Sequence, residues 1–291
     1  MSKEFNRNLD NSIIDELQKS DLWINHLKSD CKNQEVFFAI RNNEIGFYRK
    51  GGRLFGYDET NAFNTHFKYA SVMEKAVEDN YLTETELSNS KLISKFSDNY
   101  KQIKDNCERY SGDEAKGVSE IYRKNSYLSG KKIVVLDIEV SFEALDRTDG
   151  KTQDRIDILL FDTESRKLKF VEAKHFSNSE IWSRKTPKVI KQIEKYEKQI
   201  KVKKTEIIKA YTKYIDIINS IFATKLPLPV NVEDKVTLLI FDFDRNQQNG
   251  RLKELIKEKT AYNGHIVYDI GDVTGINLEN LWKEKPIIPC K

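Results

Sequence analysis

The chain has 291 residues, of which 38% are hydrophobic and 33% charged, enough apolar material for one large domain or two modest ones. Its 49 basic and 46 acidic residues leave a net charge of only +3, which by itself gives little support for a polyanionic partner. No stretch approaches the roughly 18 apolar residues of a membrane span, and no signal-peptide core is recognised. Because Cys31, Cys107 and Cys290 lack zinc or disulfide spacing, we expect free thiols in a cytoplasmic, non-membrane protein.

The first 111 residues predict an accessory module of helices and a β-meander. Apolar residues at helical spacing indicate one or two helices over 10–28. Strands are then expected over 35–40, 44–48 and 53–57, separated by the turn formers Asn42-Asn43 and Gly51-Gly52. The polar stretch that follows predicts helices over 71–80, 84–106 and 116–127, with a domain boundary at Ser111-Gly112-Asp113.

Residues 112–291 predict a second, α/β domain. After the helix at 116–127, strands are expected at 132–141, 155–162 and 168–173, and a long helix follows over about 187–222. A strand at 235–242, a short helix at 250–259 and a strand at 265–270 complete the order. This succession indicates a central mixed sheet flanked by helices.

Two acidic residues interrupt otherwise apolar strands in this second domain. Asp157 lies among isoleucine, leucine and phenylalanine, and Glu172 is surrounded by Phe170, Val171 and Ala173. Side chains alternate along a strand, so Glu172 and Lys174 project from the same face. Buried acids need a partner or a metal ion, and two converging carboxylates suit Mg²⁺ or Mn²⁺. A lysine beside them can stabilise charge during phosphodiester hydrolysis.

Arg155-Ile156-Asp157 followed, after a hairpin, by Glu172-Ala173-Lys174 resembles the PD-(D/E)XK nuclease superfamily, which has the restriction-endonuclease-like fold. The similarity covers roughly residues 116–270. It implies that Asp157 and Glu172 bind the catalytic metal and that Lys174 serves the attacking water. The proline that often precedes the motif aspartate is Ile156 here.

Gln192 and Tyr196 extend this resemblance to the RecB-like branch, which has a Q-x-x-x-Y motif and acts mainly on DNA. Residues four apart share a helix face, so both side chains are expected to turn toward the metal site and the substrate. An ordinary solvated helix face remains the alternative for this pair. The family also implies a glutamate on the helix before the sheet, a position that Glu120 suits. Glu139 is its rival for the remaining acidic role.

The helix that carries Gln192 and Tyr196 is rich in lysine. Between Arg184 and Lys213 there are eleven basic and three acidic residues, a net charge of +8. Such a run predicts a phosphate-attracting surface, to which Lys188, Lys191 and Lys195 contribute, although a solvated face with internal salt bridges would show the same composition.

These features predict a Mg²⁺-dependent nuclease, with DNA favoured over RNA through the RecB-like resemblance alone. One alternative is a non-catalytic nucleic-acid-binding or assembly protein that retains the fold. In such a protein, Asp157, Glu172 and Lys174 would form an ion-paired cluster without catalysis. Another is a nuclease that stays silent until a protein partner or activating ligand engages the N-terminal module, as would suit prokaryotic antiviral defence or repair.

Overall fold

The computed structural model describes residues 5–72, 78–87, 91–143, 153–183, 186–258 and 260–288. The chain divides into two compact units. The first comprises residues 1–5, 130–212 and 226–291, and the second comprises residues 6–129 and 213–225. Residues 112–129 and 213–225 therefore group with the N-terminal residues, whereas the sequence suggested a boundary at residue 111. The first is called the C-terminal unit and the second the N-terminal unit, and each is described by itself.

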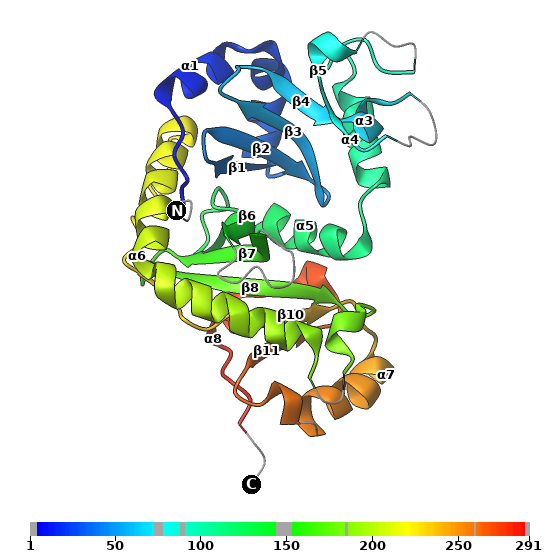
Figure 1. Cartoon of the computed structure of the whole chain (residues 1–291), viewed down its shortest axis with the longest axis vertical. Helices are drawn as coiled ribbons and strands as arrows, with labels where there is room; N and C mark the ends of the chain where they lie inside the picture. The colour runs from blue at the N-terminus through cyan, green and yellow to red at the C-terminus, as the bar shows by residue number, and fades with distance from the viewer. Residues whose placement is uncertain are drawn as a thin grey trace. The chain divides into compact units, whose positions relative to one another are not determined.

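The N-terminal unit is built on a five-stranded antiparallel sheet in the order β1-β2-β3-β4-β5 (Figure 1). Its strands are β1 (Phe37–Arg41), β2 (Glu44–Arg49), β3 (Gly52–Asp58), β4 (Phe63–His66) and β5 (Tyr81–Thr83). Its helical elements are α1 (Asn11–Lys19), η1 (Trp23–Leu27), α2 (Lys28–Lys32), α3 (Phe67–Ala70), η2 (Glu84–Glu86), α4 (Tyr100–Arg109) and α5 (Asp113–Asn125). The expected three-strand meander is confirmed, and β4 and β5 extend it.

Aromatic side chains form the core of this unit. Trp23 packs against Phe38, Phe47 and Phe222, with ring centroids about 6 Å apart in each case. The β2–β3 turn depends on Gly51, whose φ of +87° favours glycine, and where an added Cβ would lie 2.6 Å from Ala115.

The single helix expected over 84–106 is wrong. Thr83 and Glu86 form a capping box that starts only the short 3₁₀ turn η2, and α4 does not begin until Tyr100. Residues 88–90 lie outside the described residues. Half of the helix expected over 71–80 falls on 73–77, which are also outside them. Its described ends are not helical, and Ser71 bridges Leu92.

The C-terminal unit contains a mixed six-stranded sheet in the order β11-β10-β8-β7-β6, with β9 beside the start of β8. Strands β6, β7 and β8 are antiparallel neighbours, and β8, β10 and β11 are parallel. Their bounds are β6 (Ile133–Glu143), β7 (Gln153–Asp162), β8 (Lys167–His175), β9 (Asn231–Val232), β10 (Thr237–Phe241) and β11 (Ile266–Ile270). The expected α/β class and central mixed sheet are confirmed.

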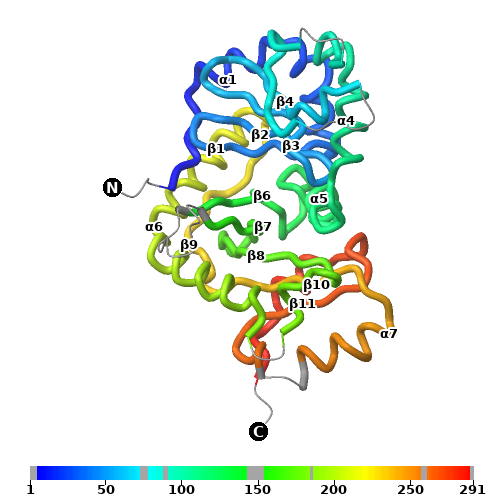
Figure 2. The backbone as a smooth tube through the Cα atoms, turned by 45° about the vertical axis from the view of Figure 1, so that its right-hand side comes forward, coloured from blue at the N-terminus to red at the C-terminus, as the bar shows by residue number. Residues whose placement is uncertain are grey.

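The helical elements of this unit include the part of α6 (Lys188–Phe222) up to residue 212, and α6 is the long helix expected from the sequence. The others are η3 (Ser179–Ile181), α7 (Arg245–Gln247), η4 (Gln248–Leu252), η5 (Glu254–Glu258), η6 (Thr260–Tyr262), η7 (Val273–Gly275) and α8 (Leu278–Lys283). The helix expected over 250–259 is instead π-helical and kinked at Gly250, which has a non-helical ψ of −107°. Figures 1 and 2 both show the first part of α6 lying along the sheet.

Among the described residues, no helix combines the length and apolar character needed to cross a bilayer. Cys31 and Cys107 are buried free thiols, as the sequence predicted. Cys290 lies outside the described residues.

Candidate active site

The β7–β8 hairpin carries the two acids that the sequence singled out. A tight turn closes the hairpin, in which Asp162 accepts hydrogen bonds from the backbone of Glu164 and Ser165. The backbone pairing of the strands ends at Ile158 opposite Val171. Asp157 immediately precedes Ile158 and Glu172 immediately follows Val171, so both acids flank the last pair of the hairpin ladder.

Asp157 is fixed by the neighbouring strand. Its Oδ2 accepts a 2.8 Å hydrogen bond from the backbone N–H of Ala173, just where the main-chain pairing has ended. The strands therefore separate at this point, and a side chain replaces the missing main-chain acceptor.

Glu172 and Lys174 form a buried ion pair. The lysine Nζ lies 3.0 Å from Glu172 Oε1 and 3.3 Å from Glu180 Oε2, and Glu172 and Lys174 are only 1% and 6% exposed. Burying a charge is costly unless it is paired, and this pairing compensates the carboxylate. Glu180 was missed by the sequence analysis, because the 3₁₀ turn η3 that brings it to Lys174 has no distinctive sequence pattern.

Gln192 and Tyr196 share one face of α6, as expected, but Tyr196 is buried. Its hydroxyl accepts a 2.6 Å hydrogen bond from Gln192 Nε2 and donates one of 2.6 Å to the carbonyl oxygen of Arg155. Burial, followed by the negative charge of Glu172, raises the pKa of Tyr196 well above its ordinary value, and the charge of Asp157 adds to this effect. The hydroxyl is therefore a neutral tie between α6 and β7, two residues before Asp157.

A second tie between the same elements involves Asp154, which the sequence analysis did not select. Gln199 Nε2 donates to Asp154 Oδ2 at 2.7 Å, and Lys195 Nζ lies 3.0 Å from Asp154 Oδ1. Lys195, expected to contact nucleic acid, is thus engaged with a buried acid. The sequence did contain a signal for Gln199. Gln192, Tyr196 and Gln199 are spaced so that they share one helix face, and polar residues that repeat on a face directed at a sheet indicate contacts with it.

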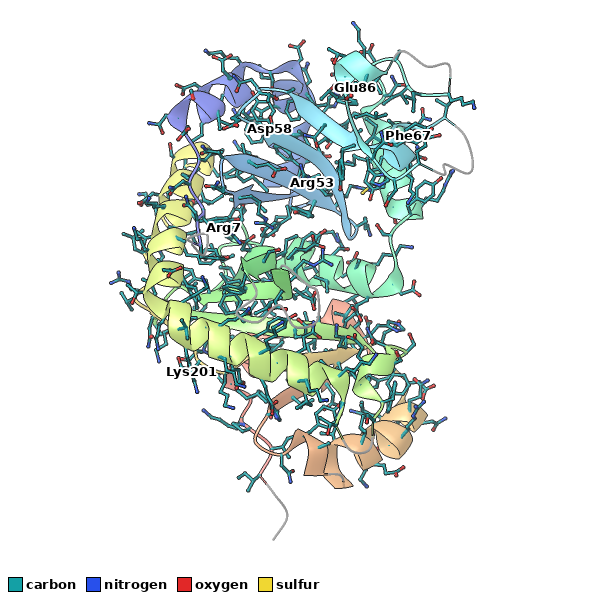
Figure 3. All side chains as sticks on the ribbon, in the orientation of Figure 1. Arg7, Arg53, Asp58, Phe67, Glu86 and Lys201 are labelled. Atoms are coloured by element: carbon teal, nitrogen blue, oxygen red, sulfur yellow. The ribbon has the colours of Figure 1, made fainter. Side chains whose placement is uncertain are left out.

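Other lysines of α6 lie on its solvent-facing side. Lys188 and Lys191 are exposed, as a phosphate-attracting surface requires, and Figure 3 shows Lys201 projecting from the same helix. Lys203 is buried, and Lys204 pairs with Asp234 at 3.2 Å. Arg184 and Lys185 lie outside the described residues.

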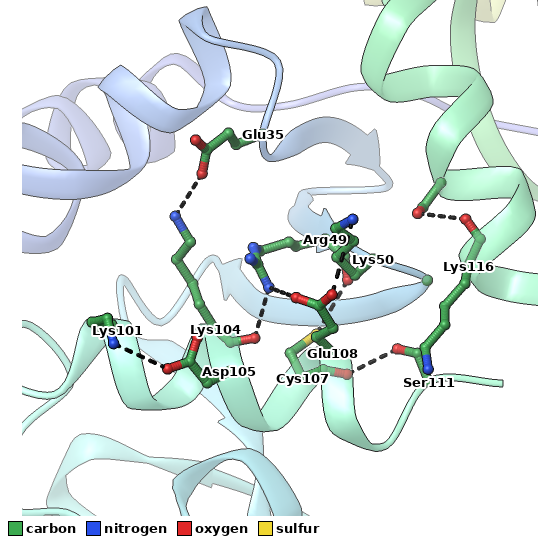
Figure 4. A network of polar contacts seen from close by, with 12 residues as sticks. Glu35, Arg49, Lys50, Lys101, Lys104, Asp105, Cys107, Glu108, Ser111 and Lys116 are labelled. Carbon is green, nitrogen blue, oxygen red and sulfur yellow. Dashed lines mark hydrogen bonds and ion pairs between the residues drawn. The ribbon is translucent and has the colours of Figure 1, made fainter. Parts of the chain in front are cut away.

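Glu120 lies on α5 in the N-terminal unit, where it has basic partners. Its carboxylate is 3.0 Å from Lys50 Nζ and 2.7 Å from Arg123 Nη2. Burial acts to raise the pKa of Glu120, but the hydrogen bonds from Arg123 and Lys50 outweigh it and lower that pKa. Figure 4 shows the adjoining network, in which Arg49 and Lys50 both reach Glu108. The structure therefore assigns Glu120 to a salt-bridge network within its own unit.

Glu139 lies on β6, which pairs with β7 on the side opposite to β8. The β6–β7 pairs Ile138–Ile158 and Val140–Ile156 bracket it, and its φ of +48° is left-handed. Such a backbone conformation is uncommon for a residue other than glycine and occurs preferentially at functional sites. Its carboxylate lies 3.6 Å from Arg155 Nη1.

His175 follows Lys174 at the end of β8. Its Nε2 lies 2.6 Å from Asp242 Oδ2, and its Nδ1 lies 2.7 Å from Ser177 Oγ. These contacts join the ends of two parallel strands, because His175 is aligned with Phe241 at the end of β10.

The donor set suits a magnesium ion better than a fully enclosed metal centre. Mg²⁺ is commonly held by one or two carboxylates and keeps several waters, which Asp157 and Glu172 can satisfy. Within the described ranges, no three His, Cys, Asp or Glu side chains converge closely enough to hold a metal by themselves. A closed four-ligand site of the zinc type does not fit these residues.

Comparison of the chain with protein-family models, with curated proteins and with solved structures finds no match.

Proposed function

We propose that the protein is a metal-dependent nuclease that hydrolyses phosphodiester bonds, with its active site on Asp157, Glu172 and Lys174. The observation that carries this proposal is that Asp157 accepts a hydrogen bond from the backbone of Ala173, the residue between Glu172 and Lys174, while the ammonium of Lys174 lies 3.0 Å from Glu172. The resemblance of these residues to the PD-(D/E)XK motif supports the same reaction. The mixed sheet with α6 alongside is compatible with the restriction-endonuclease-like core that this resemblance implies.

Asp157 and Glu172 would hold a Mg²⁺ or Mn²⁺ ion, which when bound supplies Lewis acidity and an activated water. Lys174 carries the positive charge that stabilises the phosphorane-like transition state and orients the attacking water. Its contacts with Glu172 and Glu180 hold the ammonium in one place, so little reorganisation is needed during the reaction.

Gln192 and Tyr196 act in this proposal as positioning residues. Tyr196 is 1% exposed and bonded to Arg155, so it sets the path of β7 ahead of Asp157. Lys188 and Lys191 are exposed and suit contacts with substrate phosphates. DNA is proposed over RNA through the RecB-like resemblance, with prokaryotic antiviral defence or repair as the setting and the N-terminal unit as the place where an activating partner or ligand engages.

The test compares the wild-type chain with Asp157→Asn and Lys174→Ala on labelled duplex DNA, single-stranded DNA and RNA, in Mg²⁺, Mn²⁺ and EDTA. Metal-dependent cleavage that both variants lose supports the proposal and identifies the substrate. Calorimetric titration of Mn²⁺ runs in parallel. Metal binding without cleavage indicates a missing activator. The absence of both metal binding and cleavage would overturn the catalytic proposal.

The second candidate function is a non-catalytic nucleic-acid-binding or assembly protein. The contacts of Lys174 favour it, because an ammonium held between Glu172 and Glu180 is also what a structural ion-pair cluster requires. This candidate predicts nucleic-acid binding that is unchanged by EDTA and no cleavage under any of the conditions above.

A further inference from the structure

Two segments leave the sheet at the same edge as Lys174. Strands β8 and β10 are parallel, and His175 is aligned with Phe241 at their carboxyl ends. The segment after β8 carries Glu180 to Lys174 and then reaches Trp182. The segment after β10 forms α7 and η4, which Figures 1 and 2 show beyond the end of that strand. The carboxyl ends of adjacent parallel strands are a common place for ligands.

An arginine from one segment covers a tryptophan from the other. The guanidinium carbon of Arg251 lies 3.8 Å from the centroid of the Trp182 ring, which is stacking distance. Arg251 is exposed and Trp182 is half-buried. Trp182 is itself held in place, because its Nε1 donates to the carbonyl oxygen of Phe176 at 2.8 Å and its ring packs edge-on against Phe176. Within the described residues, the Arg251 guanidinium contacts the Trp182 ring.

The segment around Arg251 exposes basic and amide side chains. Between Asp244 and Glu254 it contains three basic side chains, Arg245, Arg251 and Lys253. All three are exposed, as are Asn246 and Asn249, whose amides can both donate and accept hydrogen bonds. Amide and guanidinium groups are the side chains that most often read base edges.

We propose that Trp182 and Arg251 form a stacking subsite for an unpaired nucleobase of the strand bound at the Asp157–Glu172–Lys174 site. This inference rests on the proposed function and specifies its substrate as a strand with unpaired bases. An aromatic ring and a guanidinium plane both stack on bases without regard to sequence. The base would take the place of Arg251 over the ring or stack on the guanidinium, while Arg245 and Lys253 neutralise the flanking phosphates.

The experiment measures binding rather than cleavage, so it remains informative if the nuclease proposal fails. A fluorescein-labelled single-stranded oligonucleotide and its abasic counterpart, equal in length and charge, are titrated with Asp157→Asn in EDTA. Arg251→Ala and Trp182→Leu are then introduced on this background, with Lys283→Ala, an exposed basic residue on α8, as the matched control. Affinity is read from anisotropy, and quenching of tryptophan fluorescence is followed in the same titration.

We expect the base-bearing strand to bind about tenfold more tightly than the abasic strand, and this difference to fall below about threefold in both variants but not in the control. Quenching should disappear in Trp182→Leu. Equal affinity for the two strands, or unchanged affinity in Arg251→Ala, would overturn the subsite. Because Arg251 is exposed, its alanine variant should fold normally. A lower melting temperature with unchanged binding would show that the Trp182–Arg251 stack stabilises the fold and does not bind a base.

Discussion

The backbone N–H of Ala173 donates its hydrogen bond to Asp157 Oδ2 at 2.8 Å, on the residue that separates Glu172 from Lys174. One carboxylate is therefore oriented by the strand that carries the other carboxylate and the lysine. Because one Asp157 oxygen has this structural task, the carboxylate has both a positional and a chemical role, and substitutions can separate them.

Asp157→Asn should remove metal binding while keeping the fold. An asparagine Oδ1 can still accept from Ala173, whereas the negative charge that attracts a divalent ion is lost. Asp157→Ala removes the acceptor as well and should lower the free energy of unfolding by about 1–3 kcal/mol more than Asp157→Asn. Mn²⁺ calorimetry and urea denaturation distinguish the two effects; tight Mn²⁺ binding by Asp157→Asn would contradict the ligand assignment.

Lys174→Met should destabilise the protein, because Glu172 is 1% exposed and would lose its 3.0 Å partner. Removing one member of a buried ion pair costs about 3–5 kcal/mol. The double variant Glu172→Gln/Lys174→Met leaves no uncompensated charge of this pair and should recover much of that loss. Chemical denaturation of the wild type, of the single variants Glu172→Gln and Lys174→Met, and of the double variant gives the coupling energy, and a coupling near zero would mean that solvent screens the pair.

Tyr196→Phe should lower kcat, by up to about tenfold, without raising KM for the nucleic-acid substrate. The buried hydroxyl acts through Arg155 on the path of β7, and its loss leaves a carbonyl oxygen without that donor, at a cost of about 1 kcal/mol in stability. Steady-state kinetics with thermal melting provides the measurement. A raised KM with unchanged kcat would instead indicate that Tyr196 contacts the strand, as its sequence motif first suggested.

Lys169 should make stability depend on pH on the alkaline side of neutrality. Burial lowers its pKa to about 8, against roughly 10.4 in an unfolded chain, while Nζ donates to the carbonyl oxygen of Trp282. Between these values the unfolded chain binds more protons, so the free energy of unfolding should rise with pH from about 8 to 10.4. Lys169→Met should flatten this rise relative to wild type, and the partly exposed Lys167→Met serves as the control.

Removal of Lys188 and Lys191 together should weaken nucleic-acid binding equally for all sequences. Each phosphate contact contributes about one unit to the slope of log Kd against log salt concentration, so the double alanine variant should lower that slope by about 2. Lys283→Ala is the control for a basic residue elsewhere. An unchanged slope would place the bound strand away from this face of α6.

Much of the sheet that carries the site could be predicted from the sequence. Strands β7 and β8 are strongly apolar, and for that reason Asp157 and Glu172 were conspicuous within them. The length of α6 followed from its periodicity. The restriction-endonuclease-like identity of the fold remains a prediction based on the resemblance.

Other parts of the site could not be predicted because they depend on tertiary packing. Glu180 reaches Lys174 only through a single 3₁₀ turn, and Asp154 meets Gln199 across 45 positions of the chain. The motif position of Tyr196 is compatible with either the buried or the exposed edge of an amphipathic helix, and packing decided between them. Glu120 suited a family position by sequence, but in the structure its carboxylate is held by Lys50 and Arg123.

The two ties between α6 and β7 bear on how the chain folds. The hairpin and the first turns of α6 are near one another in the sequence, so the contact between Asp154 and Gln199 spans only 45 positions, and such local contacts favour rapid assembly. Strand β10 begins only at Thr237 and pairs in parallel with β8, a slower kind of contact. We therefore expect the acids and the lysine to meet early, both during refolding and as the chain leaves the ribosome, before the sheet around them is complete.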